Sequence, residues 1–289
     1  MFFASPYDIR GKVALVTGAL GAIGRETSLT LANLGASLVL VDILPDSEGE
    51  KLCAQINQLD AASAIYVRAD VRSSADIERM LAEGARAFCQ IHIVVNIAGI
   101  ALYKDFYLDE DQATIDAAFD INLRAPVELT RQFVKELRAT GREGVVVNLA
   151  SYAGLVPHKF FEVYGTTKAA LIYFTQANRY LAPQIRVAAV APFFADTPMV
   201  SKSQQVKKTS FINPHTMLSV GDVARAVVRQ IESRASGGST VMLVGAWRLP
   251  VWMFDLMSVC VAITVYACWV FGWLLSLVAP TPRQKTMAA

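Results

Sequence analysis

The sequence contains few of the residues that build metal centres or disulfide frameworks. Its 289 residues include three histidines and four cysteines. The histidines are scattered along the chain, and no two cysteines form a C-x-x-C pair. Protein metal sites bring His, Cys, Asp or Glu together at short, recognisable spacings. The sequence therefore predicts no metal site, and its unpaired cysteines are typical of a reducing compartment.

Charge is also scarce. Only 18% of the residues are charged, and 27 basic residues against 25 acidic ones leave a formal net charge of +2. Proteins that bind nucleic acids usually carry a strongly basic surface. We therefore expect no nucleic-acid partner.

Hydrophobic residues are abundant by contrast, at 54% of the chain, and the mean hydropathy is +0.37. Much of this excess lies in residues 256–279, LMSVCVAITVYACWVFGWLLSLVA, which contain no charge. About 20 apolar residues in a helix span a bilayer. Tryptophan, which favours membrane interfaces, gathers in and before this run, at Trp247, Trp252, Trp269 and Trp273.

The sequence thus predicts a membrane-anchoring segment over residues 245–280, whose contact with the membrane is made by residues 256–279, and a short polar tail over 281–289. A buried C-terminal helix or an oligomer contact is the alternative. Whether the helix spans the bilayer or lies in one leaflet stays open. The N-terminal residues MFFASPYDIRGK lack the apolar stretch of a signal peptide. We therefore expect a membrane-associated protein whose main domain is cytosolic, in an organelle that the sequence does not name.

Residues 1–244 alternate between short apolar runs and stretches with helical periodicity. Seven runs rich in Val and Ile have the pattern of strands buried on both faces: KVALVTG, SLVLVD, AIYVRAD, IHIVVNIAG, GVVVNLAS, IRVAAVAP and TVMLVG. Helical stretches between the strands imply crossovers and a parallel sheet. The predicted fold is α/β, a doubly wound, Rossmann-like parallel sheet of seven strands, followed by the C-terminal hydrophobic helix. Residues 197–216 lack a clear period and are expected to form a loop or short helices near the site.

A glycine-rich turn, TGALGAIG (residues 17–24), follows the first apolar run. Gly18, Gly21 and Gly24 are each three residues apart, unlike the usual G-x-G-x-x-G. A turn between a strand and a helix offers backbone N–H groups and a positive helix dipole to a pyrophosphate. Asp42 ends the next strand, where a carboxylate accepts hydrogen bonds from ribose hydroxyls and repels a 2′-phosphate. The sequence predicts a dinucleotide site that takes NAD rather than NADP.

Tyr164 and Lys168, in YGTTK, share one face of a predicted helix. An ammonium beside a phenol favours the tyrosinate, so we expect a lowered pKa for Tyr164. Ser151 ends a strand thirteen residues earlier, and Asn96 and Asn122 fall at similar positions. Ligands of open α/β sheets bind beyond the carboxyl ends of the strands. These side chains are therefore candidates for one site.

These motifs resemble the short-chain dehydrogenase/reductase family over residues 10 to about 244. The resemblance rests on TGALGAIG, Asp42, ADV (69–71), NIAG (96–99), Asn122, Ser151, YGTTK, Pro192 and Thr197. It implies that Tyr164 is the general base or acid, that Ser151 binds the substrate oxygen, and that Lys168 binds the nicotinamide ribose and tunes Tyr164. It also implies that Asn122 holds a water of the proton relay.

The resemblance further implies two sets of binding residues. The NAD set is Gly18, Gly21, Ile23, Gly24, Asp42, Asp70, Val71, Asn96, Ala98, Gly99, Tyr164, Lys168 and Thr197. The substrate set is Ser151, Phe161 and Phe193. The family also pairs through helices that would contain residues 113–139 and 164–181, which implies a homodimer. Three positions depart from the family pattern: Ala22, Ile97 and Phe193 stand where Gly, Asn and Gly are usual.

The segments AGLVP and MLSVGDVARAVVRQIE are most similar to those of the NAD-linked 15-hydroxyprostaglandin dehydrogenase-like subgroup. The expected function is a membrane-tethered, NAD-dependent oxidoreductase that interconverts an alcohol with a ketone or aldehyde on a lipophilic molecule, such as a sterol, retinoid, sphingoid or fatty derivative. Two alternatives stay open. One is an NADPH-linked lipid ketone reductase of the 3-ketosphinganine type, and the other is a non-catalytic, NAD-binding membrane scaffold.

Overall fold

The computed structural model describes residues 6–102, 106–107, 111–157, 159–201, 217–233 and 240–243. All of them belong to one compact unit, Met1–Arg248. The predicted membrane-anchoring segment and polar tail lie outside the described residues. Within the described residues, no helix has the length and hydropathy needed to cross a bilayer.

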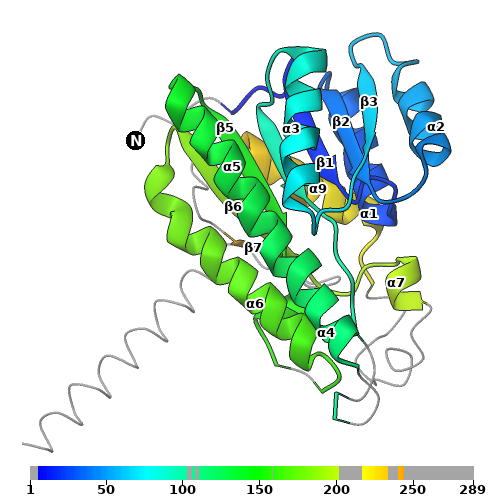
Figure 1. Ribbon diagram of the computed structural model, residues 1–289, viewed down its shortest axis with the longest axis vertical. Helices are drawn as coiled ribbons and strands as arrows, with labels where there is room; N and C mark the ends of the chain where they lie inside the picture. The colour runs from blue at the N-terminus through cyan, green and yellow to red at the C-terminus, as the bar shows by residue number, and fades with distance from the viewer. Residues whose placement is uncertain are drawn as a thin grey trace, which may run out of the picture. The chain divides into compact units, whose positions relative to one another are not determined.

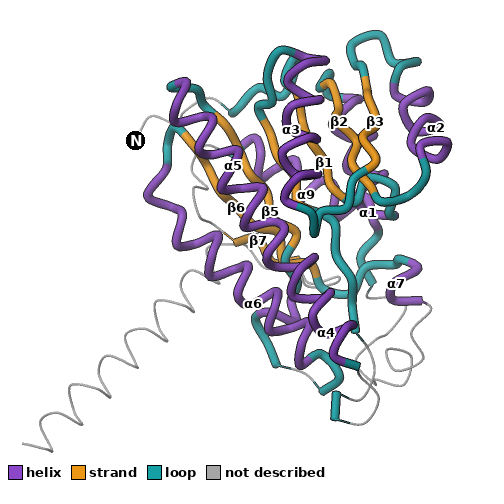
Figure 2. Tube along the Cα trace, in the orientation of Figure 1, coloured by secondary structure: helices purple, strands orange, loops and turns teal. Residues whose placement is uncertain are grey.

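A parallel sheet forms the centre of this unit (Figures 1 and 2). Its order is β3-β2-β1-β4-β5-β6-β7, and every neighbouring pair is parallel. The strands are β1 Val13–Thr17, β2 Ser37–Asp42, β3 Ala64–Arg68, β4 Ile93–Asn96, β5 Gly144–Leu149, β6 Ile185–Pro192 and β7 Thr240–Leu243. The predicted α/β class and the doubly wound, Rossmann-like parallel sheet are confirmed.

Helices connect successive strands. They are α1 Ala22–Asn33, α2 Asp46–Ile56, α3 Ser74–Phe88, α4 Gln112–Phe119, α5 Ala125–Thr140, α6 Glu162–Ala177, α7 Pro198–Ser201 and α9 Val220–Glu232. A π-helical turn, Asp120–Arg124, joins α4 to α5, and two short 3₁₀ turns cover Tyr152–Gly154 and Asn178–Leu181. Of the predicted loop 197–216, the structure describes α7; residues 202–216 lie outside the described ranges.

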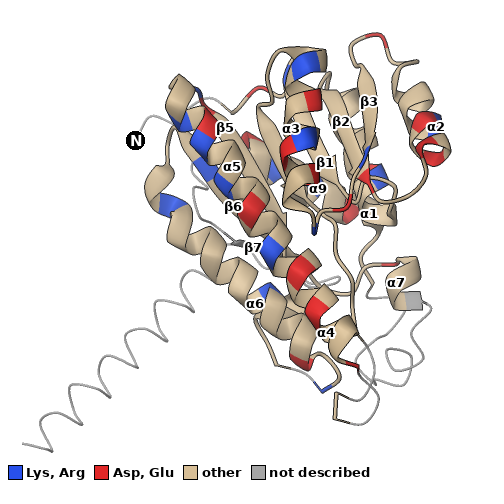
Figure 3. Cartoon of the chain, in the orientation of Figure 1, with Lys and Arg blue, Asp and Glu red and all other residues tan. Residues whose placement is uncertain are grey.

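Helices cover both faces of the sheet because alternate strand residues point to opposite sides. In β1, Ala14 and Val16 pack into a core shared with α1 and α9, whereas Val13 and Leu15 pack into a second core with α3 and α5. Acidic and basic side chains are interspersed on the outer surfaces of α3 and α5 (Figure 3).

The strand order determines where along the edge of the sheet a ligand can bind. The chain runs outward from β1 through β2 to β3 and then returns to β4 on the other side of β1. The crevice between the carboxyl ends of β1 and β4 is the switch point where doubly wound sheets bind ligands.

Arg186 is a buried arginine that joins β6 to the last described helix. Its side chain is 3% exposed. Its guanidinium donates to the carbonyls of Gln230 (3.4 Å), Ile231 (2.7 Å) and Ser233 (2.5 Å), at the end of α9. The last carbonyls of a helix lack partners within the helix, and they carry the negative end of its dipole. The Arg186 guanidinium supplies both hydrogen bonds and positive charge at that end.

The first test replaces this arginine by lysine. We expect Arg186→Lys to lower the free energy of unfolding by about 1–3 kcal/mol, because one ammonium cannot reach three carbonyls and leaves buried acceptors unsatisfied. Urea unfolding followed by circular dichroism measures the change. The control is Arg179→Lys, an exposed arginine of the second 3₁₀ turn, with an expected change within about 0.5 kcal/mol. Equal losses in the two variants would contradict the assignment.

Candidate active site

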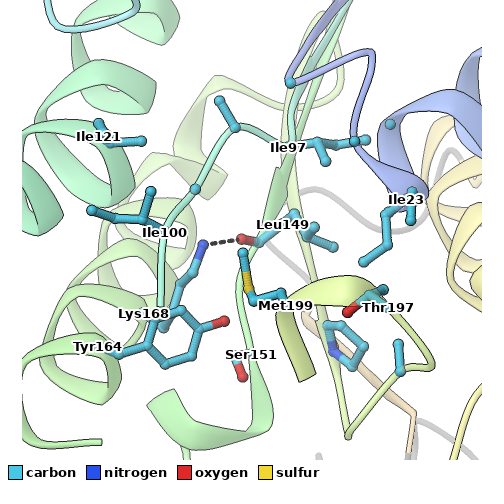
Figure 4. A pocket seen from close by; sticks show the side chains of 18 of the residues that line it. Ile23, Ile97, Ile100, Ile121, Leu149, Ser151, Tyr164, Lys168, Thr197 and Met199 are labelled. Atoms are coloured by element: carbon cyan, nitrogen blue, oxygen red, sulfur yellow. Dashed lines mark hydrogen bonds between the residues drawn. The ribbon is translucent and has the colours of Figure 1, made fainter. Parts of the chain in front are cut away.

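A cavity of about 640 Å³ opens beyond the carboxyl ends of β1 to β6. Figure 4 shows it from close by. Most of the residues predicted from the sequence lie in its wall, although they come from distant parts of the chain. They are Gly18, Gly21, Ile23, Gly24, Asp42, Asp70, Val71, Ala98, Gly99, Ser151, Phe161, Tyr164, Lys168, Phe193 and Thr197. Asn96 and Asn122 do not line it.

The three glycines of the glycine-rich turn differ in what an added Cβ atom would contact. Gly18 has a φ of +65°, and a Cβ there would lie 2.8 Å from the Cα of Ala98. A Cβ at Gly24 would lie 2.0 Å from the carbonyl oxygen of Gly18, so α1 can start this close to the turn only with glycine. Gly21 is exposed, and a Cβ there would meet that oxygen at 3.3 Å.

Gly21 is also the N-cap of α1, with no side chain capping the helix. The first N–H groups of α1 are therefore left to a ligand, and a helix N-terminus of this kind favours an anion. A cradle of this shape, which a Cβ would obstruct, fits the pyrophosphate of a dinucleotide. In the unusual spacing of TGALGAIG, Ala22 is the first residue of α1 and lines the cavity beside Gly21.

Asn96 lies beneath the cavity wall and takes part in a buried hydrogen-bond network. It is 6% exposed, and its Nδ2 donates to Oδ1 of Asn148 at 2.8 Å. Asn148 in turn donates to Oγ1 of Thr175 on α6 at 2.9 Å. Thr17 Oγ1 accepts from the backbone N–H of Ile97, the residue after Asn96, at 3.1 Å. Buried polar side chains thus tie β1, β4, β5 and α6 together below the site.

Asn122 lies in the π-helical turn and is 1% exposed. Its Oδ1 accepts from the backbone N–H of Ile100 (2.9 Å), and its Nδ2 donates to the Ile100 carbonyl (2.8 Å). A Cβ at Gly99 would lie 3.2 Å from the same Oδ1. Single π-helical turns occur frequently at functional sites. Here the turn lets the Asn122 amide hold the segment after β4 that lines the cavity.

Ser151, Tyr164 and Lys168 come together where β5 ends beside α6. Ser151 caps the turn Tyr152–Gly154 by accepting from the Ala153 N–H at 3.2 Å. This turn packs against the backbone of α6, where a Cβ at Gly154 would lie 2.6 Å from the carbonyl carbon of Lys168. Lys168 Nζ donates to the Leu149 carbonyl at 2.7 Å (Figure 4) and lies 5.7 Å from the Tyr164 ring centroid.

Burial shifts the titration of this pair. Loss of hydration lowers the pKa of Lys168 to about 8. Burial also raises the pKa of Tyr164, and a hydrogen bond with Ser151 opposes that rise. The lowering expected for Tyr164 from the neighbouring ammonium is therefore not found. The physical reason is that loss of hydration of the phenolate outweighs the hydrogen bond with Ser151.

Two carboxylates lie at the other end of the cavity. Asp42 Oδ2 accepts from the N–H of Leu20 at 3.0 Å, which ties the end of β2 to the glycine-rich turn. Asp70 forms an ion pair with Arg72, with 2.6 Å between Oδ2 and Nη2. Hydrogen bonds from Arg72 hold the pKa of Asp70 below its usual range. Sequence reasoning missed Arg72, although its position two residues after Asp70 was visible.

An aromatic wall, formed by Tyr152, Phe161, Phe193 and Phe194, closes the end of the cavity near Tyr164. Ring centroids lie 5.0 Å apart for Tyr152 and Phe193, 5.0 Å for Phe193 and Phe194, and 6.1 Å for Phe161 and Phe194. The first two pairs are edge-to-face, a favourable arrangement for aromatic rings. Phe193, which departs from the family pattern, is accommodated because Tyr152 provides a partner ring.

In the part of the chain that the structure describes, no group of three or more His, Cys, Asp or Glu side chains could hold a metal ion. The cavity wall is built from the glycine-rich turn, the Asp42 carboxylate, the Asp70–Arg72 ion pair, the Ser151–Tyr164–Lys168 group and apolar side chains.

Comparison with known proteins identifies the family. Residues 12–208 match the family model described as short chain dehydrogenase. The chain belongs to the short-chain dehydrogenase family. It is therefore an oxidoreductase that acts on hydroxyl or keto groups with a nicotinamide dinucleotide.

Individual relatives of this short-chain dehydrogenase cover most of its length. Human 3-hydroxyacyl-CoA dehydrogenase type-2 is 30% identical over 259 residues, covering 84% of this chain and 97% of the relative. The structure of a 3-ketoacyl-(acyl-carrier-protein) reductase from Brucella melitensis, complexed with NADH, has a TM-score of 0.73 and 28% identity and covers 83% of this chain and 100% of its own. A short chain dehydrogenase from Burkholderia cenocepacia J2315, in complex with NADP, has a TM-score of 0.73 and 27% identity, covering 83% and 98%. Its structural relatives therefore bind either dinucleotide.

The second test compares two glycines of the turn in this short-chain dehydrogenase. We expect Gly24→Ala to lower the free energy of unfolding by about 1–3 kcal/mol, because its Cβ would overlap the backbone of Gly18. Gly21→Ala should leave the fold largely intact but weaken NADH binding by about tenfold, because a methyl group obstructs the phosphate cradle. Thermal unfolding and NADH fluorescence titration separate the two effects. Unchanged NADH affinity in Gly21→Ala would contradict the assignment of the cradle.

Proposed function

We propose that this short-chain dehydrogenase is a membrane-tethered, NAD-dependent enzyme that interconverts a secondary alcohol and a ketone, or an alcohol and an aldehyde, on a lipophilic substrate. The observation that carries the proposal is the position of Ser151, Tyr164 and Lys168 in the wall of a cavity that also contains the glycine cradle and the aromatic wall. One cavity therefore offers proton-transfer groups, a phosphate site and an apolar binding surface.

The residues have distinct roles in this chemistry. In alcohol oxidation, the Tyr164 oxygen accepts the hydroxyl proton, and in reduction its O–H donates a proton to the carbonyl oxygen. Ser151 donates a hydrogen bond to the same substrate oxygen and stabilises its developing charge. Lys168 places a positive charge beside Tyr164 and would hold the nicotinamide ribose of a bound dinucleotide. The bound dinucleotide supplies or accepts the hydride.

The preference for NAD is supported by the end of β2. The Asp42 carboxylate lines the cavity and would repel a 2′-phosphate. The next two residues, Ile43 and Leu44, also line it and offer a phosphate neither charge nor side-chain hydrogen bonds. Arg72, the nearby cation in the wall, is paired with Asp70.

The lipophilic substrate is supported by the aromatic wall and by isoleucines that line the same cavity. Ile97, Ile100 and Ile121 line the cavity (Figure 4). Apolar surface removed from water contributes roughly 25 cal/mol per Å² to binding. The human relative is named for hydroxyacyl-CoA, a substrate class with an apolar chain. The tether rests on the uncharged residues 256–279 of the sequence.

The third test removes the phenol oxygen. We expect Tyr164→Phe to reduce turnover by about 10²–10⁴-fold, with NADH affinity within about twofold of the wild type. Because burial raises the pKa of Tyr164, the wild-type oxidation rate should increase with pH, and the variant should lose this dependence. Tyr173→Phe is the control, because Tyr173 lies on the same helix and is 75% exposed. Unchanged turnover in Tyr164→Phe would exclude the mechanism.

The fourth test concerns the substrate class. The detergent-solubilised full chain is assayed by NADH formation with sterol, retinoid, sphingoid and fatty alcohols and with small sugar alcohols. We expect lipophilic alcohols to give kcat/KM values at least about 100-fold higher. Phe193→Ala should lower these values by about tenfold or more, because an aromatic contact with the apolar part of the substrate is lost, and leave the sugar values unchanged. Preferential oxidation of sugar alcohols would overturn the lipophilic assignment.

A further inference from the structure

The turn that follows β2, residues 42–44, carries the groups that face the ribose end of the cavity. Ile43 is 54% exposed and Leu44 46% exposed, and both line the cavity with Asp42. The Asp42 carboxylate accepts from the N–H groups of Ile43 (2.8 Å) and Leu44 (3.3 Å) through Oδ1. These contacts fold the turn around the carboxylate but do not anchor it to the sheet.

Two side chains of the neighbouring strand β3 provide the anchor. Tyr66 Oη donates its single proton to the nearby carbonyls of Leu44 (2.6 Å) and Asp42 (3.1 Å), which share it, and the Asp42 carbonyl also accepts from the Ala69 N–H at 2.9 Å. Arg68 Nε donates to the carbonyl between them, that of Ile43, at 3.3 Å. Tyr66 and Arg68 are two residues apart on one strand and therefore project from the same face of the sheet. All three carbonyls of the turn thus accept from β3.

The Tyr66 ring is itself confined. A Cβ at Gly49 on α2 would lie 2.0 Å from the ring carbon Cγ, so the glycine lets the helix backbone pack flat against the ring. Burial and the nearby Asp42 carboxylate raise the pKa of Tyr66 to about 12. The hydroxyl therefore keeps its proton at any ordinary assay pH and remains a donor to the turn.

The turn 42–44 is also hydrogen-bonded to the glycine-rich turn that forms the phosphate cradle. Asp42 Oδ2 accepts from the N–H of Leu20, inside the glycine-rich turn, at 3.0 Å. A shift of the turn would therefore move the carboxylate away from both the cradle and the ribose. Preorganised groups bind more tightly because less order has to be imposed on binding.

We propose that Tyr66 is a positioning residue for the dinucleotide. The Tyr66 hydroxyl fixes the turn 42–44, and the position of this turn determines how strongly Asp42 discriminates between NAD and NADP. This inference rests on the proposed preference for NAD. Tyr66 does not line the cavity among the described residues, so it acts through the turn and touches no ligand itself.

The fifth test is Tyr66→Phe, which keeps the ring under Gly49 and removes only the hydroxyl. We expect the Kd for NADH to rise about fivefold, the Kd for NADPH to change by less than about twofold, and kcat at saturating NAD to stay within about twofold of the wild type. Direct fluorescence titration of the full chain gives both Kd values without any substrate. Tyr180→Phe is the control, because Tyr180 is 72% exposed and lies beyond α6.

A double-mutant cycle with Asp42→Ala tests whether Tyr66→Phe changes the NADH/NADPH preference through the Asp42 carboxylate. If Tyr66 acts through Asp42, Tyr66→Phe should change the NADH/NADPH preference of the wild type but not that of Asp42→Ala. Additive effects, an unchanged preference in Tyr66→Phe, or equal weakening of both dinucleotides would overturn the inference. A wild-type preference for NADPH would instead overturn the proposed cofactor, and a failure to bind either dinucleotide would overturn both.

Discussion

The site depends on how closely the turn after β1 approaches the segment after β4. At Gly18, a single added carbon would lie 2.8 Å from the Ala98 backbone. The two segments form adjacent walls of the cavity. Thr17, at the end of β1, does not line the cavity, but its Oγ1 accepts a hydrogen bond from the backbone N–H of Ile97 and so joins the two segments. The crevice of a doubly wound sheet is therefore kept narrow enough for backbone N–H groups to reach one ligand.

Much of this arrangement could be predicted from the sequence, because it depends on periodicity and on the ends of strands. The apolar residues of α3, Ser74–Phe88, recur at the helical period in the sequence. The buried strands had continuous apolar runs, as parallel strands must. Tyr164 and Lys168, placed on one helix face by their spacing, lie together in the cavity wall with Ser151.

The remaining features depend on side-chain geometry that spacing does not encode. Asn96 donates to Asn148, a residue of β5 that no local pattern in the sequence connects to it. Likewise, the pKa of Tyr164 depends on how completely its oxygen is removed from water, and a nearby positive charge in the sequence says nothing about that. Tyr66 gave no signal, since an aromatic residue in a strand is ordinary.

Arg186 has a consequence for the synthesis of the chain. Its last carbonyl acceptor, Ser233, lies 47 residues further on. A nascent chain that ends before α9 carries the β6 guanidinium without the three carbonyls that later surround it. Burying a charge without such acceptors costs free energy. Burial of β6 is therefore unfavourable until α9 has been made. The stable burial of β6 therefore depends on the end of α9, which lies more than 30 residues further along the chain.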